Sequence, residues 1–157
     1  TLANPANADV HLGSFYHLAF AKKVVDTFKE SHHHDMHRVI MFQGMEGYDD
    51  IRPGFTKVAE WTNDEFTDYG IETAEYGMDF EGEDLNVDDI ATDSAAITEE
   101  VVAGDRDDQF ADAIALNAAV RIYAREDVDS IDEGLTVARE AIADGSAAAV
   151  LEELQAF

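Results

Sequence analysis

Residues 38–54 read RVIMFQGMEGYDDIRPG, and this stretch decides the fold. Its first part, from Arg38 to Gln43, is a short apolar run that is partly β-branched, which predicts a buried strand. Gly44 and Gly47 follow and predict a turn. A strand that ends in a glycine turn is typical of an α/β unit, in which the carboxyl ends of the strands carry the functional residues.

The segments on either side extend this unit. Upstream, residues 14–30 predict an amphipathic helix, because apolar residues recur on one face at helical spacing: Leu18, Ala21, Val25 and Phe28. Downstream, residues 55–61 and 65–71 predict two strands joined by Thr62-Asn63-Asp64, which indicates a hairpin. Trp61 is most simply a packing residue of this hairpin, and residues 72–89 are expected to form an acidic surface loop.

The last part of the chain predicts helices. Asp93 is the expected N-cap of a helix that runs to Ala103, with Gly104 just beyond its end. A helix over residues 107–124 is apolar nearly all round, which is typical of a buried helix. Ser130 and Glu133 form a capping-box pattern that begins a helix ending near Gly145. Ser146 is expected to cap a short final helix that reaches Leu154.

Composition limits the kinds of partner that this chain can have. It has 157 residues, with 35 acidic and 10 basic side chains and a formal net charge of −25. The length suggests one domain, the absence of cysteine excludes disulfides, and no apolar run is long enough to cross a membrane. The charge argues against DNA, RNA and anionic lipid as partners, because these polyanions would be repelled.

The acidic residues are spread along the whole chain rather than gathered in one block. At molar salt the Debye length falls to about 3 Å, so repulsion between these charges would be screened. We therefore expect a cytoplasmic protein of a salt-accumulating organism, and the rival interpretation is an acidic partner of a basic protein. Because the chain opens with Thr1 in a loop-like stretch, we also expect it to be the middle and end of a longer protein.

Three carboxylates stand in the glycine-rich stretch after the predicted strand: Glu46, Asp49 and Asp50. Carboxylate oxygens are hard ligands that suit Mg²⁺, which usually combines one or two protein carboxylates with substrate phosphates. The simpler interpretation is an ordinary acidic loop in a very acidic protein. A second candidate metal site is formed by His32, His33, His34 and His37, although a solvated polar connector is the simpler interpretation of these histidines.

Asn117 and Arg121 are polar residues one turn apart on the apolar helix over residues 107–124. They are either a polar contact to a substrate or neighbouring loop, or a hydrogen-bonded pair within the core, and the pair is the simpler interpretation.

Several motifs in order resemble the C-terminal half of anthranilate phosphoribosyltransferase and its relatives in glycosyltransferase family 3. Asn4-Pro5-Ala6 resembles the end of the family's G-P-L-x-N-P-A segment, and Gly47-Tyr48-Asp49-Asp50-Ile51 is similar to its G-x-D-E-I. Residues 56–60 resemble the strand T-x-V-x-E that follows. Further likenesses lie at residues 75–78, in the helix with Leu116-Asn117-Ala118-Ala119, and at residues 133–154.

The resemblance implies an α/β fold: the C-terminal part of a mainly parallel sheet flanked by helices, with a β-hairpin and a helical C-terminal segment. It implies that residues 1–157 are the C-terminal portion of a phosphoribosyltransferase domain. The family's N-terminal helical domain and glycine-rich diphosphate loop lie upstream of this region. They would be on a missing half, either a separate chain or a cleaved fragment, and the full protein is expected to be a dimer.

The implied reaction transfers phosphoribose from phosphoribosyl diphosphate to anthranilate, with Mg²⁺, in tryptophan biosynthesis. Asp49 and Asp50, with Glu46 beside them, are the implied metal ligands, and Asn4, Gly44 and Asn117 are candidate substrate contacts. This chain alone is expected to be inactive, because the diphosphate loop is upstream.

Two departures from the family leave a second function open. Asp50 stands where the family usually has Glu, and Gln43 stands where it often has His. Gln43, together with Met45-Glu46 before Gly47, resembles a divergent branch of the family, so the alternative is a non-catalytic, transferase-like protein that binds a nucleotide or nucleic acid. A third hypothesis is an acidic adaptor that uses the helices after Asp93 as a contact surface.

Overall fold

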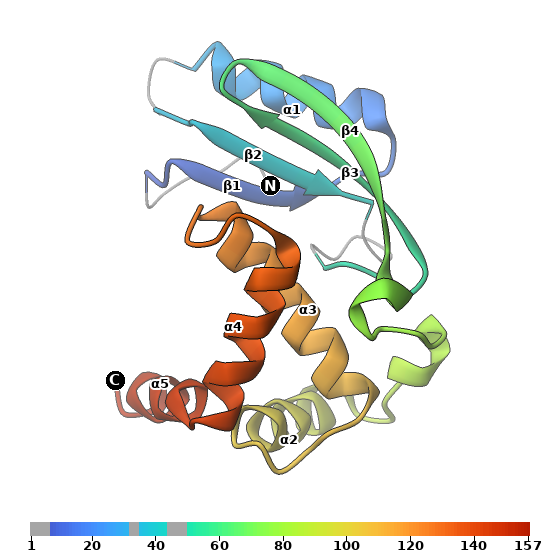
Figure 1. Ribbon diagram of the computed structural model, residues 1–157, viewed down its shortest axis with the longest axis vertical. Coiled ribbons are helices and arrows are strands. Elements are labelled where there is room, and N and C mark those ends of the chain that lie inside the picture. The colour runs from blue at the N-terminus through green and yellow to red at the C-terminus, as the bar shows by residue number, and fades with distance from the viewer. Residues whose placement is uncertain (1–6, 32–34, 44–49) are drawn as a thin grey trace. The chain divides into compact units, whose positions relative to one another are not determined.

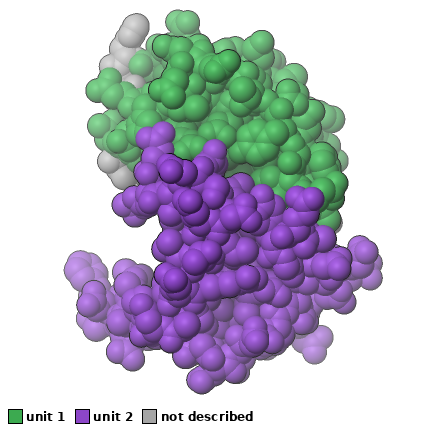
Figure 2. Space-filling model, viewed as in Figure 1, with its two compact units in different colours: residues 1–73 green, residues 74–157 purple. Residues whose placement is uncertain are grey.

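The computed structural model describes residues 7–31, 35–43 and 50–157. The chain divides into two compact units, residues 1–73 and residues 74–157, which Figure 2 colours separately. The described part of the first unit holds a β-sheet and one α-helix, and the second holds helices (Figure 1). An α/β chain with a hairpin and a helical C-terminal segment is therefore confirmed.

Four strands form the sheet of the first unit in the order β1-β2-β3-β4. Their bounds are β1 Val10–Ser14, β2 Arg38–Phe42, β3 Phe55–Thr62 and β4 Glu65–Glu72. Strands β1 and β2 are parallel, with Val10 opposite Arg38. β2 and β3 are antiparallel, as are β3 and β4.

The parallel pairing that the resemblance implied is present, within the described residues, only between β1 and β2. Parallel neighbours need a long crossover, which the helix between them provides. β3 and β4 are joined instead by the tight turn at Asn63 and Asp64, whose φ angles are 50° and 64°. Such a turn can only join antiparallel strands, so the hairpin makes this part of the sheet mixed.

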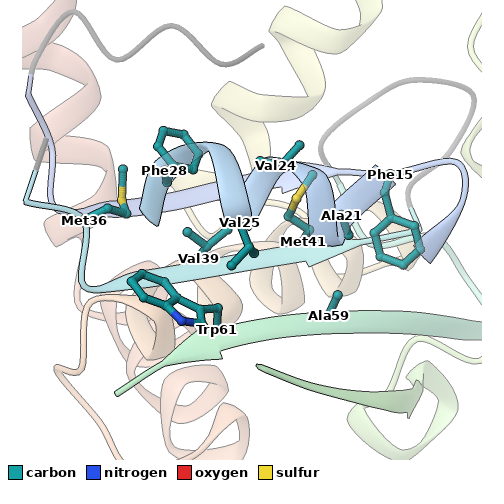
Figure 3. Close-up of a cluster of buried hydrophobic side chains, with 10 residues drawn as sticks. All are labelled: Phe15, Ala21, Val24, Val25, Phe28, Met36, Val39, Met41, Ala59 and Trp61. Atoms are coloured by element: carbon teal, nitrogen blue, oxygen red, sulfur yellow. The ribbon is translucent and has the colours of Figure 1, made fainter. Parts of the chain in front are cut away.

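Helix α1 (Leu18–Lys29) covers one face of the sheet. Figure 3 shows its buried side chains above those that alternate along β2 and β3, a pattern that follows from the period of two in a strand. The cluster contains Phe15, Ala21, Val24, Val25, Phe28, Met36, Val39, Met41, Ala59 and Trp61. The predicted helix face and the packing role of Trp61 are thus confirmed.

The predicted helix start was too early. Ser14 is the last residue of β1, opposite Phe42, and the amide of Phe15 donates to the Phe42 carbonyl at 3.0 Å. The backbone from Ser14 to Phe15 is therefore used by the sheet, and α1 can begin only at Leu18.

The second unit consists of helices. Two short 3₁₀-helices, η1 (Thr73–Tyr76, whose first residue closes the first unit) and η2 (Gly82–Leu85), occur in the stretch that was predicted to be a loop. The α-helices are α2 Ile90–Val102, α3 Gln109–Ala124, α4 Ile131–Ala143 and α5 Ser146–Gln155. Helices α3 and α4 pack side by side (Figure 1). In α3 five of the 16 residues are buried and only Arg121 is exposed, so the helix is largely covered but less deeply buried than predicted.

Two predicted helix caps were wrong. The N-cap of α2 is Asp89, whose carboxylate accepts a hydrogen bond from the Thr92 amide at 3.0 Å. Asp93 instead lies in the first turn and accepts from the Asp89 amide at 2.9 Å. At α5 the N-cap is Gly145, whose left-handed φ of 81° suits glycine, and Ser146 is the first helical residue.

The capping-box prediction for α4 is confirmed in its first half only, because the Glu133 side chain bonds the amide before the N-cap Ser130 and not that of Ser130 itself. The Ser130 hydroxyl accepts from the Glu133 amide at 3.2 Å, and the Glu133 carboxylate accepts from the Asp129 amide at 3.0 Å. Over the described ranges, no helix combines the length and the apolar character that crossing a bilayer requires.

Candidate functional site

The candidate site lies where the chain leaves β2 and returns to β3. Of the predicted Mg²⁺ ligands, Asp50 is the one within the described residues, and it is exposed. Glu46, Asp49, Gly44 and Asn4 lie outside the described residues, as do His32, His33 and His34. The structure therefore bears on the site through Asp50 and the residues that hold it.

The residues after Asp50 are fixed at several points. Ile51 is only 2% exposed. The Arg52 carbonyl accepts a hydrogen bond from the Thr56 hydroxyl at 3.3 Å, and Thr56 is fully buried. The exposed Asp50 is thus followed at once by a buried anchor.

Gly54 and Thr73 complete this attachment. The Gly54 amide donates to the Thr73 hydroxyl at 2.8 Å, and the Thr73 amide donates to the Gly54 carbonyl at 3.0 Å. Gly54 has φ of 87°, which is unfavourable for a residue with a side chain. The chain beyond Asp50 is therefore tied to the end of β4.

The strand before the site is also held beyond its last ladder residue. The Gln43 amide donates to the Lys57 carbonyl at 2.9 Å, so the pairing with β3 continues past Phe42. Lys57 is itself paired, because its ammonium lies 3.0 Å from the Asp68 carboxylate. Both sides of the candidate loop therefore start from fixed backbone.

A buried ion pair lies in the same sheet, and sequence reasoning missed it. The Arg38 Nε and Nη2 atoms donate to Glu60 Oε1 at 2.9 and 2.6 Å, and the Tyr69 hydroxyl donates to Glu60 Oε2 at 2.9 Å. The two charged side chains are 6% and 7% exposed. The available signal was a charge inside each of two neighbouring strands: Arg38 at the start of an apolar run and Glu60 between Ala59 and Trp61.

Asn117 belongs to the second unit, on α3. Its side-chain amide donates to the Ala113 carbonyl at 3.0 Å, one turn earlier in the helix. The Arg121 guanidinium donates to the Asn117 carbonyl at 2.9 Å. The two residues are linked along the helix through a backbone carbonyl, but the predicted hydrogen-bonded pair within the core is wrong, because Arg121 is exposed.

The second unit has a hollow at η1 and α4 whose charge is unsuited to an anion. Arg139 there is already paired, since its guanidinium donates to the Asp112 carboxylate at 3.1 Å. Burial raises the pKa of the nearby Tyr76 hydroxyl, and the carboxylates of Asp132 and Glu75 raise it further. These carboxylates would repel a phosphate, and the guanidinium of Arg139 would not offset the repulsion because it is paired with Asp112.

Of the four histidines of the second candidate metal site, only His37 lies within the described residues, so the structure does not test that site. His37 lies 3.8 Å from the Asp9 carboxylate, which makes an exposed pair. In the part of the chain that the structure describes, no three side chains of His, Asp or Glu gather closely enough to hold a metal ion.

Comparison with known proteins gives one consistent result. The family model described as "Glycosyl transferase family, a/b domain" matches residues 1–148. Anthranilate phosphoribosyltransferase of Paraburkholderia phymatum is 30% identical over 99% of this chain, which covers 45% of that protein. The chain thus spans about half the length of the curated relatives that it matches.

Solved structures agree on the fold. The crystal structure of anthranilate phosphoribosyltransferase from Thermus thermophilus has a TM-score of 0.76 and 26% identity, over 96% of this chain and 43% of that one. The enzyme of Saccharomyces cerevisiae in complex with PRPP and Mg has a TM-score of 0.62 and 23% identity, over 73% of this chain and 33% of that one.

Proposed function

Because the chain belongs to the glycosyl transferase family through its a/b domain, we propose that it is the C-terminal part of an anthranilate phosphoribosyltransferase. The observation that carries the proposal is the length of the match, since the family model extends over residues 1–148 of 157. The relatives that the chain resembles over its whole length act on anthranilate. We infer the same acceptor and phosphoribosyl diphosphate as the donor.

The proposed role of this chain is to hold a divalent cation on the donor's diphosphate. The exposed Asp50 carboxylate offers hard oxygen donors, which fit Mg²⁺, and the yeast relative has been solved with PRPP and Mg. Bound Mg²⁺ neutralises charge on the diphosphate leaving group. Asp50 would bind and orient the ion, with Asp49 and Glu46 as further candidate ligands.

The charge of the chain makes such a cation necessary. A net charge of −25 repels a diphosphate, and a cation between the two removes that repulsion locally. We propose that residues 1–157 need an N-terminal helical domain and a glycine-rich loop from the missing half to bind the donor. The proposal includes Asn4, Gly44 and Asn117 as substrate contacts, a dimer of the full protein, and a location in the cytoplasm.

Titration calorimetry on the full-length source protein tests the proposal. Phosphoribosyl diphosphate should bind only when Mg²⁺ is present, and Asp50→Asn should weaken this binding about tenfold. Asp64→Asn is the matched control, because it removes one exposed carboxylate from the hairpin turn, where asparagine tolerates the positive φ.

Each contrary result has a separate meaning. If the wild-type protein does not bind phosphoribosyl diphosphate with Mg²⁺, the transferase proposal fails and the non-catalytic alternative takes its place. If the wild type binds and Asp50→Asn binds equally well, Asp50 is not a metal ligand.

A further inference from the structure

Gly54 is attached to Thr73 through both its amide and its carbonyl. Two hydrogen bonds, one in each direction, join the residues, and one of them uses a side chain. Thr73 is fully buried. A buried hydroxyl that accepts a backbone amide is costly to replace, since the amide is then left without a partner.

The geometry between Asp50 and Gly54 allows little movement. Ile51 is buried, the Arg52 carbonyl accepts from Thr56, and Gly54 is held by Thr73. The exposed Asp50 carboxylate therefore stands on backbone that is fixed within four residues of it. A metal ligand benefits from such support, because supporting contacts orient ligands and raise affinity by about 10- to 100-fold.

We propose that Thr73 is a positioning residue for Asp50, acting through the backbone of Gly54. This inference rests on the proposed function, because it concerns the same cation-binding carboxylate. The Thr73 hydroxyl does not touch substrate or metal. It holds Gly54 in its left-handed backbone conformation. In this proposal, that conformation sets the orientation of the backbone between Gly54 and Asp50.

The test compares three variants of the full-length source protein. Thr73→Val keeps the shape and removes the hydroxyl, whereas Thr73→Ser keeps the hydroxyl. Gly54→Ala disturbs the same turn from the other side, since its φ of 87° strains alanine although no atom lies within 4 Å of the new Cβ. Val25→Ala, in the core between α1 and the sheet, controls for lost stability alone.

Two measurements are made on each variant: amide exchange at Gly54 by NMR, and calorimetric binding of phosphoribosyl diphosphate with Mg²⁺. Thr73→Val should speed amide exchange at Gly54 and weaken binding about tenfold. Thr73→Ser should keep both the exchange rate and the binding close to those of the wild type. Gly54→Ala should weaken binding similarly. Val25→Ala should lower the unfolding midpoint and leave binding unchanged.

The outcomes separate the two proposals. Suppose that the wild type binds and that Asp50→Asn weakens binding, whereas Thr73→Val and Gly54→Ala do not. Thr73 is then only structural, and the inference is overturned while the proposed function stands. If Val25→Ala weakens binding as much as Thr73→Val, the effect is general instability and the inference again fails. If the wild type does not bind at all, the proposed function fails and the inference falls with it.

Discussion

The backbone oxygen of Ala119 lies 2.5 Å from the point that a Cβ atom on Gly134 would occupy. Gly134 is buried in α4 and Ala119 is buried in α3, so the two helices approach each other backbone to backbone at this point. The obstacle is a carbonyl within a helix rather than a side chain that can rotate away. Gly134 is therefore required by close packing and not by an unusual backbone conformation.

Gly134→Ala should destabilise the protein. Alanine favours a helix over glycine by about 1 kcal/mol, but overpacking at a backbone contact costs about 1–3 kcal/mol, so the net loss should reach up to about 2 kcal/mol. Urea unfolding in molar KCl measures it. Thr136→Ala, on the exposed face of α4, should change stability little. An increase in stability for Gly134→Ala would show that the helices separate without cost.

Phe55 should respond to a change at Gly70. The Phe55 ring occupies the space where a side chain on Gly70 would lie, across β3 and β4, and thereby covers a glycine in a strand. Gly70→Ala should displace the half-exposed ring and cost about 1 kcal/mol, whereas the same change in a Phe55→Ala background should be neutral or stabilising.

A double-mutant cycle by urea unfolding measures this coupling. The expected interaction energy is at least about 1 kcal/mol, and additive effects of the two changes would contradict the contact.

Removing one partner of the Arg38–Glu60 pair should be more harmful than removing both. Arg38→Met leaves a buried carboxylate without its cation and should cost about 3–5 kcal/mol. The double variant Arg38→Met with Glu60→Gln should recover part of that loss, because glutamine is neutral and still accepts from the Tyr69 hydroxyl. Unfolding free energies of the three proteins test this order. If the double variant is less stable than Arg38→Met, the pair does not act as a unit.

The sequence predicted element types well where local patterns determine them. The face of α1, the Asn63-Asp64 hairpin and the Ser130 cap of α4 depend on spacing of a few residues, and the structure confirms them. Caps were less predictable, because acidic residues are so frequent here that Asp89 and Asp93 are equally good candidates by type. Only the hydrogen bonds distinguish them.

Long-range contacts explain what sequence reasoning missed. Thr73 holds Gly54 from 19 residues away, and Glu60 meets Arg38 from 22 residues away, in each case across strands whose register was unknown. Within the candidate site, the sequence singled out Asp50 as a candidate metal ligand. It did not predict the hydrogen bonds that hold the backbone after Asp50. The partner of a hydroxyl or carboxylate side chain in or beside a strand cannot be predicted from sequence spacing until the pairing of the strands is known.

The N-cap of α2 should give the stability a pH dependence. Hydrogen bonds from Thr92 lower the pKa of the Asp89 carboxyl in the folded protein. A lowered pKa means that the cap stabilises the fold above the unfolded value of about 3.9, and that this contribution is lost as the pH falls through the folded pKa. Asp89→Ala should therefore be less stable than wild type at pH 7, with a difference that shrinks in acid.

Urea unfolding in molar KCl between neutral pH and about pH 2.5, below the unfolded pKa, tests this sign. Asp88→Ala removes a neighbouring exposed charge but leaves the cap, so its difference from wild type should vary less with pH. A difference at Asp89 that stays constant across the pH range would contradict the hydrogen-bonded carboxylate.

The net charge of −25 should make the fold depend on salt. Between 0.1 M and 1 M KCl the Debye length falls from about 10 Å to about 3 Å, so repulsion among exposed carboxylates is screened and the melting temperature should rise. Salt also strengthens hydrophobic burial in any protein, so the rise alone does not identify its cause. Repeating the melts near pH 4, where many carboxylates are protonated, separates charge screening from hydrophobic burial. At that pH the stabilisation by charge screening becomes smaller, whereas the effect of salt on hydrophobic burial does not. An equal salt effect at both pH values would assign the stabilisation to the core, and full stability at low salt and neutral pH would favour the acidic adaptor over a protein built for a salt-rich cytoplasm.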